Sequence, residues 1–364
     1  MDRDQGTAEG PVAYDAILGG PARTGTLSDK ARSSYALARE ALAAGRFDDA
    51  ANLGRHTVEE AREAYELYRD WIGQIRDYLI EYGVAASMVS EGEARLAVLL
   101  RAPDGRAFDL DAGWRAYIEA IERFATLATK GDAEAATTAL REAWALWLDA
   151  HDKGCDQVGG MLDLVVEHLG ESHVGPLWDR LMAPMYDFYD RYDTDSAPWP
   201  ISFQRILTVA IEALRGHLSG PTREGDIEIT DEKDRVVLRF DPCGSGGRSM
   251  RTDPVTGERP RMEAPFGFRV TTRAHPWSWS KKGICVYCVH CCQLNMRMPI
   301  AKFGYPTRVV EPPTWPEARI GGKCSWIIYK DPRLVPDAAY EAVGEMKPSA
   351  IGSAATRARR QGRS

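Results

Sequence analysis

The chain has 364 residues, of which 44% are hydrophobic and 27% are charged, and its formal net charge is -7. This composition is typical of a soluble globular protein with enough residues for two domains, and it excludes collagen-like, fibrous and wholly disordered chains. The negative charge also argues against nucleic acid as a partner.

The N-terminal residues carry no recognisable targeting or membrane signal. Residues 1–10 are polar and acidic, and no stretch of the chain approaches the ~18 consecutive apolar residues of a membrane-spanning helix. We therefore expect a cytoplasmic protein with no membrane partner. Residues 1–28 are rich in Gly, Pro, Ala and Thr without helical periodicity, which predicts a flexible arm.

Residues 29–220 are predicted to form a helical domain, because apolar side chains recur there at helical spacing. Asp48 and Gly83 stand where an N-cap and a C-terminal glycine would delimit one long helix. Two acidic helix faces, one around His56 and one around His151, are interpreted as exposed to solvent. The predicted helices span residues 29–44, 48–82, 90–102, 110–129, 132–169, 172–192 and 200–218, with a break in the fifth near Gly159-Gly160.

Residues 221–346 have a different composition, with short alternating segments rich in β-branched residues and separated by turn residues. This pattern predicts an antiparallel sheet, so the fold class is α+β, with an all-helical N-terminal domain followed by a Cys-rich sheet domain. Residues 347–364 are basic and contain no acidic residue, which predicts a disordered tail. The expected strands are 227–230, 236–240, 266–272, 307–310 and 324–329, with a short helix within 291–303.

The cysteines are concentrated in the second region, where six of the seven occur; only Cys155 lies outside it. In a reducing compartment such clustering indicates metal binding or catalysis before disulfides. Cys285 and Cys288 form a Cys-x-x-Cys pair, which can present two thiolates to one zinc ion, and zinc prefers four ligands. The remaining ligands are expected among Cys243, His290, Cys291, Cys292 and Cys324. An iron–sulfur cluster is the alternative, although the spacing matches neither ferredoxin pattern.

A glycine-rich loop, Cys243-Gly-Ser-Gly-Gly-Arg248, follows the second predicted strand. Its glycines can expose backbone N–H groups that bind an anion. Cys243 is therefore a candidate nucleophile as well as a metal ligand, and Arg248 is a candidate anchor for an anionic group of a substrate.

Residues 271–283, which lie between this loop and the Cys-x-x-Cys pair, contain two tryptophans and a histidine, and further aromatic residues follow. His275 is a candidate ligand or general base in this segment, and His290 is a second candidate catalytic residue. The aromatic side chains either line an apolar pocket beside the metal or pack in the core. They are Trp277, Trp279, Tyr287, Trp315 and Trp326.

The segment from Cys291 to Tyr329 contains Phe303-Gly-Tyr-Pro306 and then Gly321-Gly-Lys-Cys324, which is followed by an alternating strand. This order resembles the end of the vinyl-reductase-like domains and is similar to the end of the aminothiazoline-carboxylate hydrolase family. The resemblance covers about a tenth of the chain. It implies a structural zinc next to a small-molecule pocket, with Cys324 as one ligand and a cysteine among 285–292 as its partner.

We therefore predict a metal-dependent enzyme, with zinc as the metal, that acts on a small organic molecule as a hydrolase or lyase. In this interpretation Cys285 and Cys288 hold the metal with Cys324 and one further ligand, while Arg248 or His275 assists. One alternative is a small-molecule-binding or regulatory module with a structural zinc, and a second is an iron–sulfur redox protein. The sequence leaves a homo-oligomer open.

Overall fold

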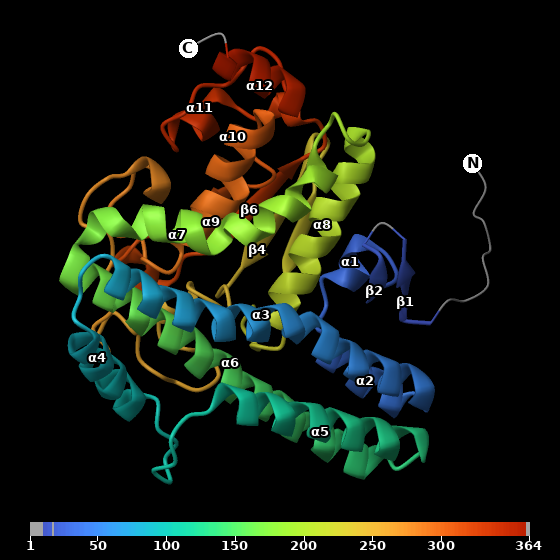
Figure 1. The fold of residues 1–364 in the computed structure, drawn as a ribbon. Helices are drawn as coiled ribbons and strands as arrows, with labels where there is room; N and C mark the ends of the chain where they lie inside the picture. Colours follow the sequence, from blue (N-terminus) through green and yellow to red (C-terminus); the bar gives the residue numbers. More distant parts are fainter. Residues whose placement is uncertain (1–9, 17, 362–364) are drawn as a thin grey trace, which may run out of the picture.

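The structure is a computed structural model that describes residues 10–16 and 18–361 (Figure 1). The first half of the chain is helical, and antiparallel strands follow in the second half, so the α+β class is confirmed. The N-terminal elements are β1 (Val12–Asp15), β2 (Gly20–Arg23), α1 (Leu27–Lys30), α2 (Ser34–Ala43), α3 (Phe47–Glu81), α4 (Ala86–Leu99), α5 (Leu110–Thr129), α6 (Ala133–Leu169), α7 (Val174–Met182) and α8 (Trp199–Gly216).

The C-terminal half contains one small sheet and several short helices. Its elements are β3 (Glu228–Asp231), β4 (Arg235–Phe240), α9 (Val289–Cys292), α10 (Met298–Phe303), β5 (Val309–Glu311), β6 (Cys324–Tyr329), α11 (Asp337–Glu341) and α12 (Ser353–Gln361). The strands pair antiparallel in the order β3-β4-β6-β5. A π-helical segment, Gln293–Arg297, joins α9 to α10.

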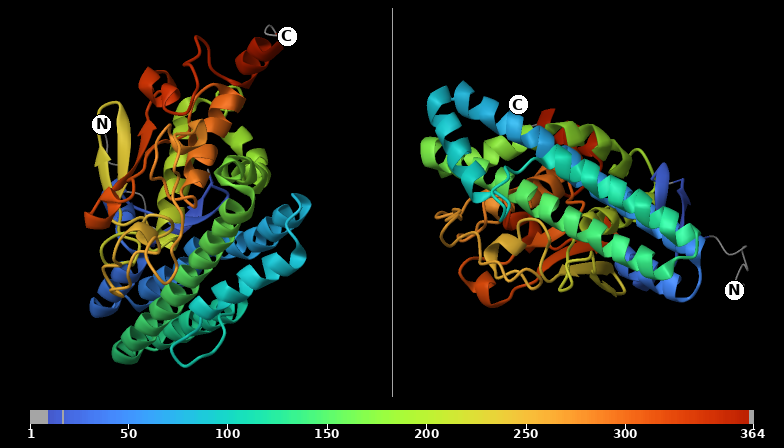
Figure 2. Two further views of the ribbon diagram at one scale, coloured as in Figure 1. Left: turned by 90° about the vertical axis from the view of Figure 1, so that its left-hand side faces the viewer. Right: turned by 90° about the horizontal axis from the view of Figure 1, so that it is seen from below.

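The long helices α3, α5 and α6 lie side by side and form one layer of the molecule (Figures 1 and 2). Helix α8 packs against α3 and also contacts β6, so it links this layer to the sheet. Buried apolar side chains of both halves form one continuous core. No helix within the described residues has a segment long and apolar enough to cross a membrane.

Helix α6 is continuous, so the break predicted near Gly159-Gly160 is wrong. A Cβ atom at Gly160 would lie 2.6 Å from the side chain of Leu96, and one at Gly159 would lie 3.0 Å from the ring of Phe268. These glycines allow neighbouring segments to pack closely against the helix, so they do not interrupt it.

Other differences arise from contacts between distant parts of the chain. The expected arm contains the β1–β2 hairpin, while residues 1–9 and 17 lie outside the described residues. Residues 266–272 form no strand, because the segment contributes only an isolated bridge between Val270 and Cys285. In the expected disordered tail, α12 is helical because Asp195 accepts a hydrogen bond from the backbone of Ala354.

The helix predicted over residues 29–44 is divided into α1 and α2. Ser33 interrupts it, since its hydroxyl accepts a hydrogen bond from the backbone N–H of Ala36 and so starts a new helix. Residues 183–192, predicted as the second half of a helix, are 3₁₀-helical, with Pro184 near their start.

Candidate functional site

A cavity of about 510 Å³ lies between the helical layer and the Cys-rich segments. Helices α3 and α8 and the segment 182–192 form its walls together with the glycine-rich loop and residues 287–294. Apolar side chains cover most of this surface, and the volume suits a small organic molecule. Examples of the apolar side chains are Trp71, Met182, Tyr189, Leu214, Leu294 and Trp326.

Cysteines from three separate segments meet at this cavity. Cys243 follows the end of β4, and Cys324 begins β6 opposite Phe240, so the sheet register brings both to the same end of the sheet. Cys288 and Cys291 come from the turn that opens α9. Cys243 and Cys291 line the cavity directly.

The glycine-rich loop packs directly on the Cys-x-x-Cys turn. A Cβ atom at Gly246 would lie 2.5 Å from the sulfur of Cys288, so only a glycine allows the thiol to approach the loop this closely. Gly247 packs in the same way against Cys243. The loop therefore holds two of the four thiols in place.

The thiols raise one another's pKa values. Burial raises the pKa of Cys324 well above its usual value, and the neighbouring Cys243 and Cys291 raise it further. Burial likewise raises the pKa of Cys291, with a further contribution from Cys243. A group of thiols in this position becomes a group of thiolates when a cation balances their charge.

The sulfur atoms are not preassembled around a metal position. Four sulfurs at ~2.3 Å from one zinc ion would lie ~3.8 Å apart. Within the described residues, the ligand atoms that lie mutually within 4.8 Å are those of His56, Glu60 and Glu212, and no such set contains a cysteine. Metal binding by the cysteines therefore requires side-chain rotation.

The His56–Glu60–Glu212 group is better explained as part of a buried ion network. The guanidinium of Arg215 lies 2.7 Å from Glu60 and also pairs with Glu212, while His56 Nε2 lies 2.7 Å from Glu212. Both carboxylates thus already pair with the Arg215 guanidinium. The exposed helix face predicted around His56 is wrong, because that side chain is buried.

His290 has the geometry of an oriented base. Its Nδ1–H donates to the carbonyl of Tyr287 at 2.7 Å, which leaves the lone pair of Nε2 facing the Cys291 thiol at 3.2 Å. Burial lowers the pKa of His290 to about 4, so its imidazole is neutral at pH 7. This arrangement is that of a thiol beside a base whose orientation is set by a third group.

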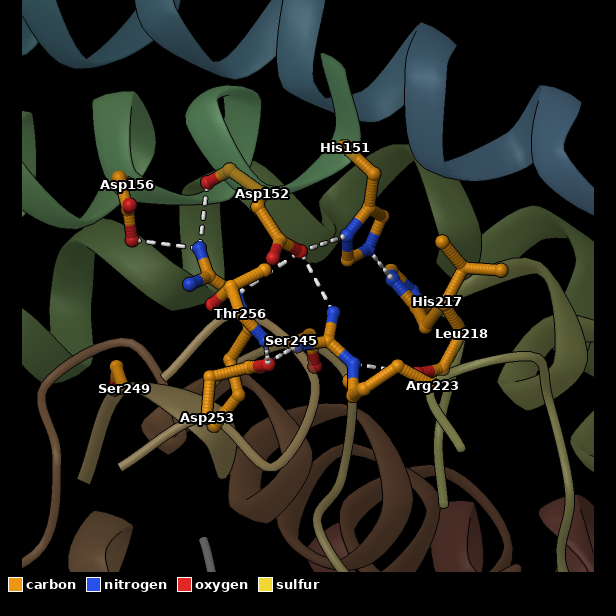
Figure 3. A network of polar contacts seen from close by, with 12 residues as sticks. His151, Asp152, Asp156, His217, Leu218, Arg223, Ser245, Ser249, Asp253 and Thr256 are labelled. Atoms are coloured by element: carbon orange, nitrogen blue, oxygen red, sulfur yellow. Dashed lines mark hydrogen bonds and ion pairs between the residues drawn. The ribbon is translucent and has the colours of Figure 1, made fainter. Parts of the chain in front are cut away.

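His217 is a second imidazole at the cavity, and it ends a buried hydrogen-bonded chain (Figure 3). Asp152 lies 2.9 Å from His151 Nδ1, and His151 Nε2 lies 3.0 Å from His217 Nδ1. Since His151 donates from Nδ1 to Asp152, its Nε2 is an acceptor. The proton between the two rings therefore belongs to His217 Nδ1, because otherwise two lone pairs would face each other.

Tyr68 adds a fourth polar group to this chain, with its hydroxyl 3.1 Å from His151 Nε2 and 3.2 Å from His217 Nδ1. Burial, followed by the nearby His151, lowers the pKa of His217 well below its usual value. His217 is therefore a neutral imidazole that carries its proton on Nδ1 and has the lone pair of Nε2 available to accept a proton.

Arg248 does not reach the cavity. Its guanidinium lies 2.6 Å from Asp156 and 3.2 Å from Asp152. Both carboxylates belong to α6 and are labelled in Figure 3. Arg223 and Arg261 complete this buried network, the first with Asp152 and the second with Asp156. Because two carboxylates already bind Arg248, it is not available as an anchor for a substrate anion.

The other candidates from the sequence lie apart from the cavity. His275 Nε2 lies 2.8 Å from Glu171, and its ring stacks on Trp277. Cys292 is buried with its sulfur 3.6 Å from the carbonyl of Pro276, and Cys285 contacts the hydroxyl of Ser249. Cys243, Cys288, Cys291 and Cys324 form the four-thiol group, and Cys285, whose thiol lies beside that of Cys288, stays a further candidate ligand.

The sequence analysis missed three residues of the site, namely His151, His217 and Arg308. His151 and Asp156 were placed on an exposed helix face, which is wrong, because both side chains are buried. No local motif marks His217 or Arg308. His217 gains its role from its hydrogen bond with His151, 66 positions away, and Arg308 from its place in the cavity wall.

The burial of His151 predicts that the stability of the fold depends on pH. Burial lowers its pKa from 6.5 to about 4, so between these values the unfolded chain binds a proton that the folded chain does not. Stability is therefore lost as the pH falls below 6.5, by about 2 kcal/mol between pH 7.5 and pH 5 for this residue. Urea unfolding of the wild type and of His151→Gln at both pH values measures the contribution. An equal pH dependence in the two proteins would contradict it.

Comparisons with family models, with curated proteins and with solved structures found no match to this chain. The functional argument therefore rests on the geometry of the site.

Proposed function

We propose that this protein is a zinc-dependent enzyme that acts on a small organic molecule in the cavity, as a hydrolase or lyase. The observation that supports the proposal is the proximity of four thiols from three separate segments, two of which, Cys243 and Cys291, line the cavity. Cysteine thiolates are a ligand type that zinc prefers.

Each group has a role in this proposal. Cys243, Cys288, Cys291 and Cys324 are the candidate metal ligands, and the apolar walls bind the substrate. A bound zinc ion would polarise a carbonyl group or a water molecule. His217 and His290, as neutral imidazoles with a free Nε2 lone pair, would accept or return a proton in the cavity.

A second candidate is a metal-free cysteine enzyme, favoured by the 3.2 Å contact between the Cys291 sulfur and His290 Nε2. In that case the Cys291 thiol adds to a carbonyl carbon of the substrate, and as the carbon–sulfur bond forms the carbonyl π pair moves to its oxygen and the thiol proton passes to His290. The two candidates differ in the metal content of the purified protein and in the effect of changing Cys324, which does not contact His290.

Single cysteine-to-serine variants test the proposal. Cys243→Ser and Cys324→Ser are expected to lose most of a stoichiometric zinc, because each removes one of four ligands. Cys155→Ser and Cys292→Ser are the matched controls, since both cysteines are buried but lie outside the four-thiol group, and they should retain it. Metal content by mass spectrometry is read together with the circular dichroism spectrum, so that unfolded variants are recognised.

A wild-type protein purified without metal, or equal loss of zinc in the controls, would contradict the zinc proposal. Retention of zinc in Cys324→Ser would remove that residue from the ligand set. A metal-free wild type whose Cys291 alone reacts with iodoacetamide at neutral pH would favour the second candidate.

A further inference from the structure

Arg308 is a buried cation without a direct ion pair among the described residues, and Glu63, an acidic group that interacts with it electrostatically, lines the same cavity. It precedes β5, is only 5% exposed and lines the cavity. The buried arginines Arg215, Arg223 and Arg248 each pair with two carboxylates, whereas Arg308 has no Asp or Glu oxygen within 4.0 Å among the described residues. A buried charge without a direct ion pair is costly, and an anionic ligand in the cavity would offset that cost at Arg308.

The free edge of the guanidinium has a defined shape. Nη1 donates to the side-chain oxygen of Asn295, while Nε is buried without any partner in the described part of the chain. Nη2 likewise makes no hydrogen bond to a described residue. The Nε and Nη2 donors together form the edge that binds both oxygens of a carboxylate.

The residue that accepts from Nη1 also has an unpaired donor. The side-chain nitrogen of Asn295 is also buried without a partner among the described residues. Asn295 belongs to the π-helical segment Gln293–Arg297, and such segments occur frequently at functional sites. Arg308, which lines the cavity, and Asn295, which lies behind it, thus each carry a buried donor without a partner among the described residues.

We propose that Arg308 binds the carboxylate of an organic molecule whose apolar body fills the cavity. One guanidinium balances the single charge of a carboxylate, and Asn295 supplies an additional donor. The ring of Trp326, 5.1 Å from the Arg308 guanidinium, shields this ion pair on one side. The inference deepens the proposed function by naming the substrate class, but anion binding at Arg308 does not itself need a metal.

The position of Arg308 relative to the thiols fits a substrate anchor. Arg308 lines the same cavity as Cys243, Cys291, His217 and His290. A carboxylate held by Arg308 would therefore place the rest of the molecule in the space that these thiols and imidazoles line.

A matched pair of ligands tests the assignment. 2-Naphthoate and 2-naphthamide have nearly the same shape, but only the first carries a charge. Isothermal titration calorimetry on the full chain is expected to show naphthoate binding at least about tenfold more tightly than naphthamide. Arg308→Gln should abolish this preference, and Arg308→Lys should reduce it, because lysine keeps the charge but loses the two-donor edge.

Arg297→Gln is the matched control. Arg297 lies in the same π-helical segment and has no ion pair among the described residues, but it is partly exposed and does not line the cavity. Its variant should keep the preference for naphthoate. Equal binding of the two ligands, no binding of naphthoate at millimolar concentration, or an unchanged preference in Arg308→Gln would each overturn the proposal.

The zinc-ligand variant Cys243→Ser separates this inference from the proposed function. If that variant prefers naphthoate as the wild type does, the anion site stands whether or not the protein binds zinc. If the wild type binds zinc but shows no carboxylate preference, the substrate class is wrong while the proposed metal site is unaffected.

Discussion

Replacing Arg248 with methionine is expected to lower the free energy of unfolding by about 3–5 kcal/mol, the usual cost of removing one partner from a buried ion pair. Arg248 is 3% exposed and is shared by Asp152 and Asp156 on α6. Methionine fills a similar volume but provides no charge. Asp156 would then retain Arg261 alone, although burial already raises the pKa of its carboxyl.

Urea unfolding measures this loss, and an exposed ion pair supplies the control. Arg62 pairs with Glu59 on the surface of α3, and Arg62→Met should cost less than about 1 kcal/mol. Adding Asp156→Asn to Arg248→Met should recover part of the loss, because the double variant removes the unbalanced carboxylate. A cost for Arg248→Met as small as that of Arg62→Met would show that the network does not stabilise the fold.

Gly216→Ala is expected to destabilise the protein by about 3 kcal/mol, at the upper end of the cost of overpacking a tight interior. Gly216 ends α8 where this helix crosses α3, and a Cβ atom there would lie 1.9 Å from the backbone oxygen of Glu60. Backbone atoms cannot move aside as a flexible side chain can. The helices would separate, and His217, the next residue, would move relative to His151.

Gly73→Ala is the matched control, because Gly73 also lies in a helix but has no atom within 4 Å of an added Cβ. Alanine has the higher helix propensity, so this variant should be stabilised by up to about 1 kcal/mol. Thermal unfolding of both variants measures the difference. If Gly216→Ala were as stable as the wild type, the close approach of α3 and α8 would not be a constraint on the fold.

The parts of the fold that depend on local pattern could be predicted from the sequence. The helix expected over 110–129 and the strand expected over 324–329 have the bounds found in the structure, because their apolar periodicity and flanking residues lie within the element itself. The predictions of secondary structure were wrong where contacts with residues distant in the sequence determine the local structure. The helix in the C-terminal tail is capped by Asp195, and Gly160 packs on Leu96.

The residue types of the candidate site could be predicted from the sequence more readily than the arrangement of these residues in space. The cysteines were found because thiols at short spacing are rare and chemically distinctive. Arg248 was predicted to bind an anionic group of the substrate, because nothing in the sequence near it shows that Asp152 and Asp156 of α6 balance its charge. Arg308 and His217 could not be found, since an arginine without a direct ion pair and a histidine at the end of a buried chain are properties of the folded protein only.

X-ray absorption at the zinc edge, on the protein as purified, tests the central claim most directly. We predict about one zinc ion per chain, with sulfur ligands at ~2.3 Å. Zinc with only nitrogen and oxygen ligands at ~2.0–2.2 Å would contradict the four-thiol site and direct attention to His56, Glu60 and Glu212. Iron with sulfide, or no metal at all, would equally contradict the claim.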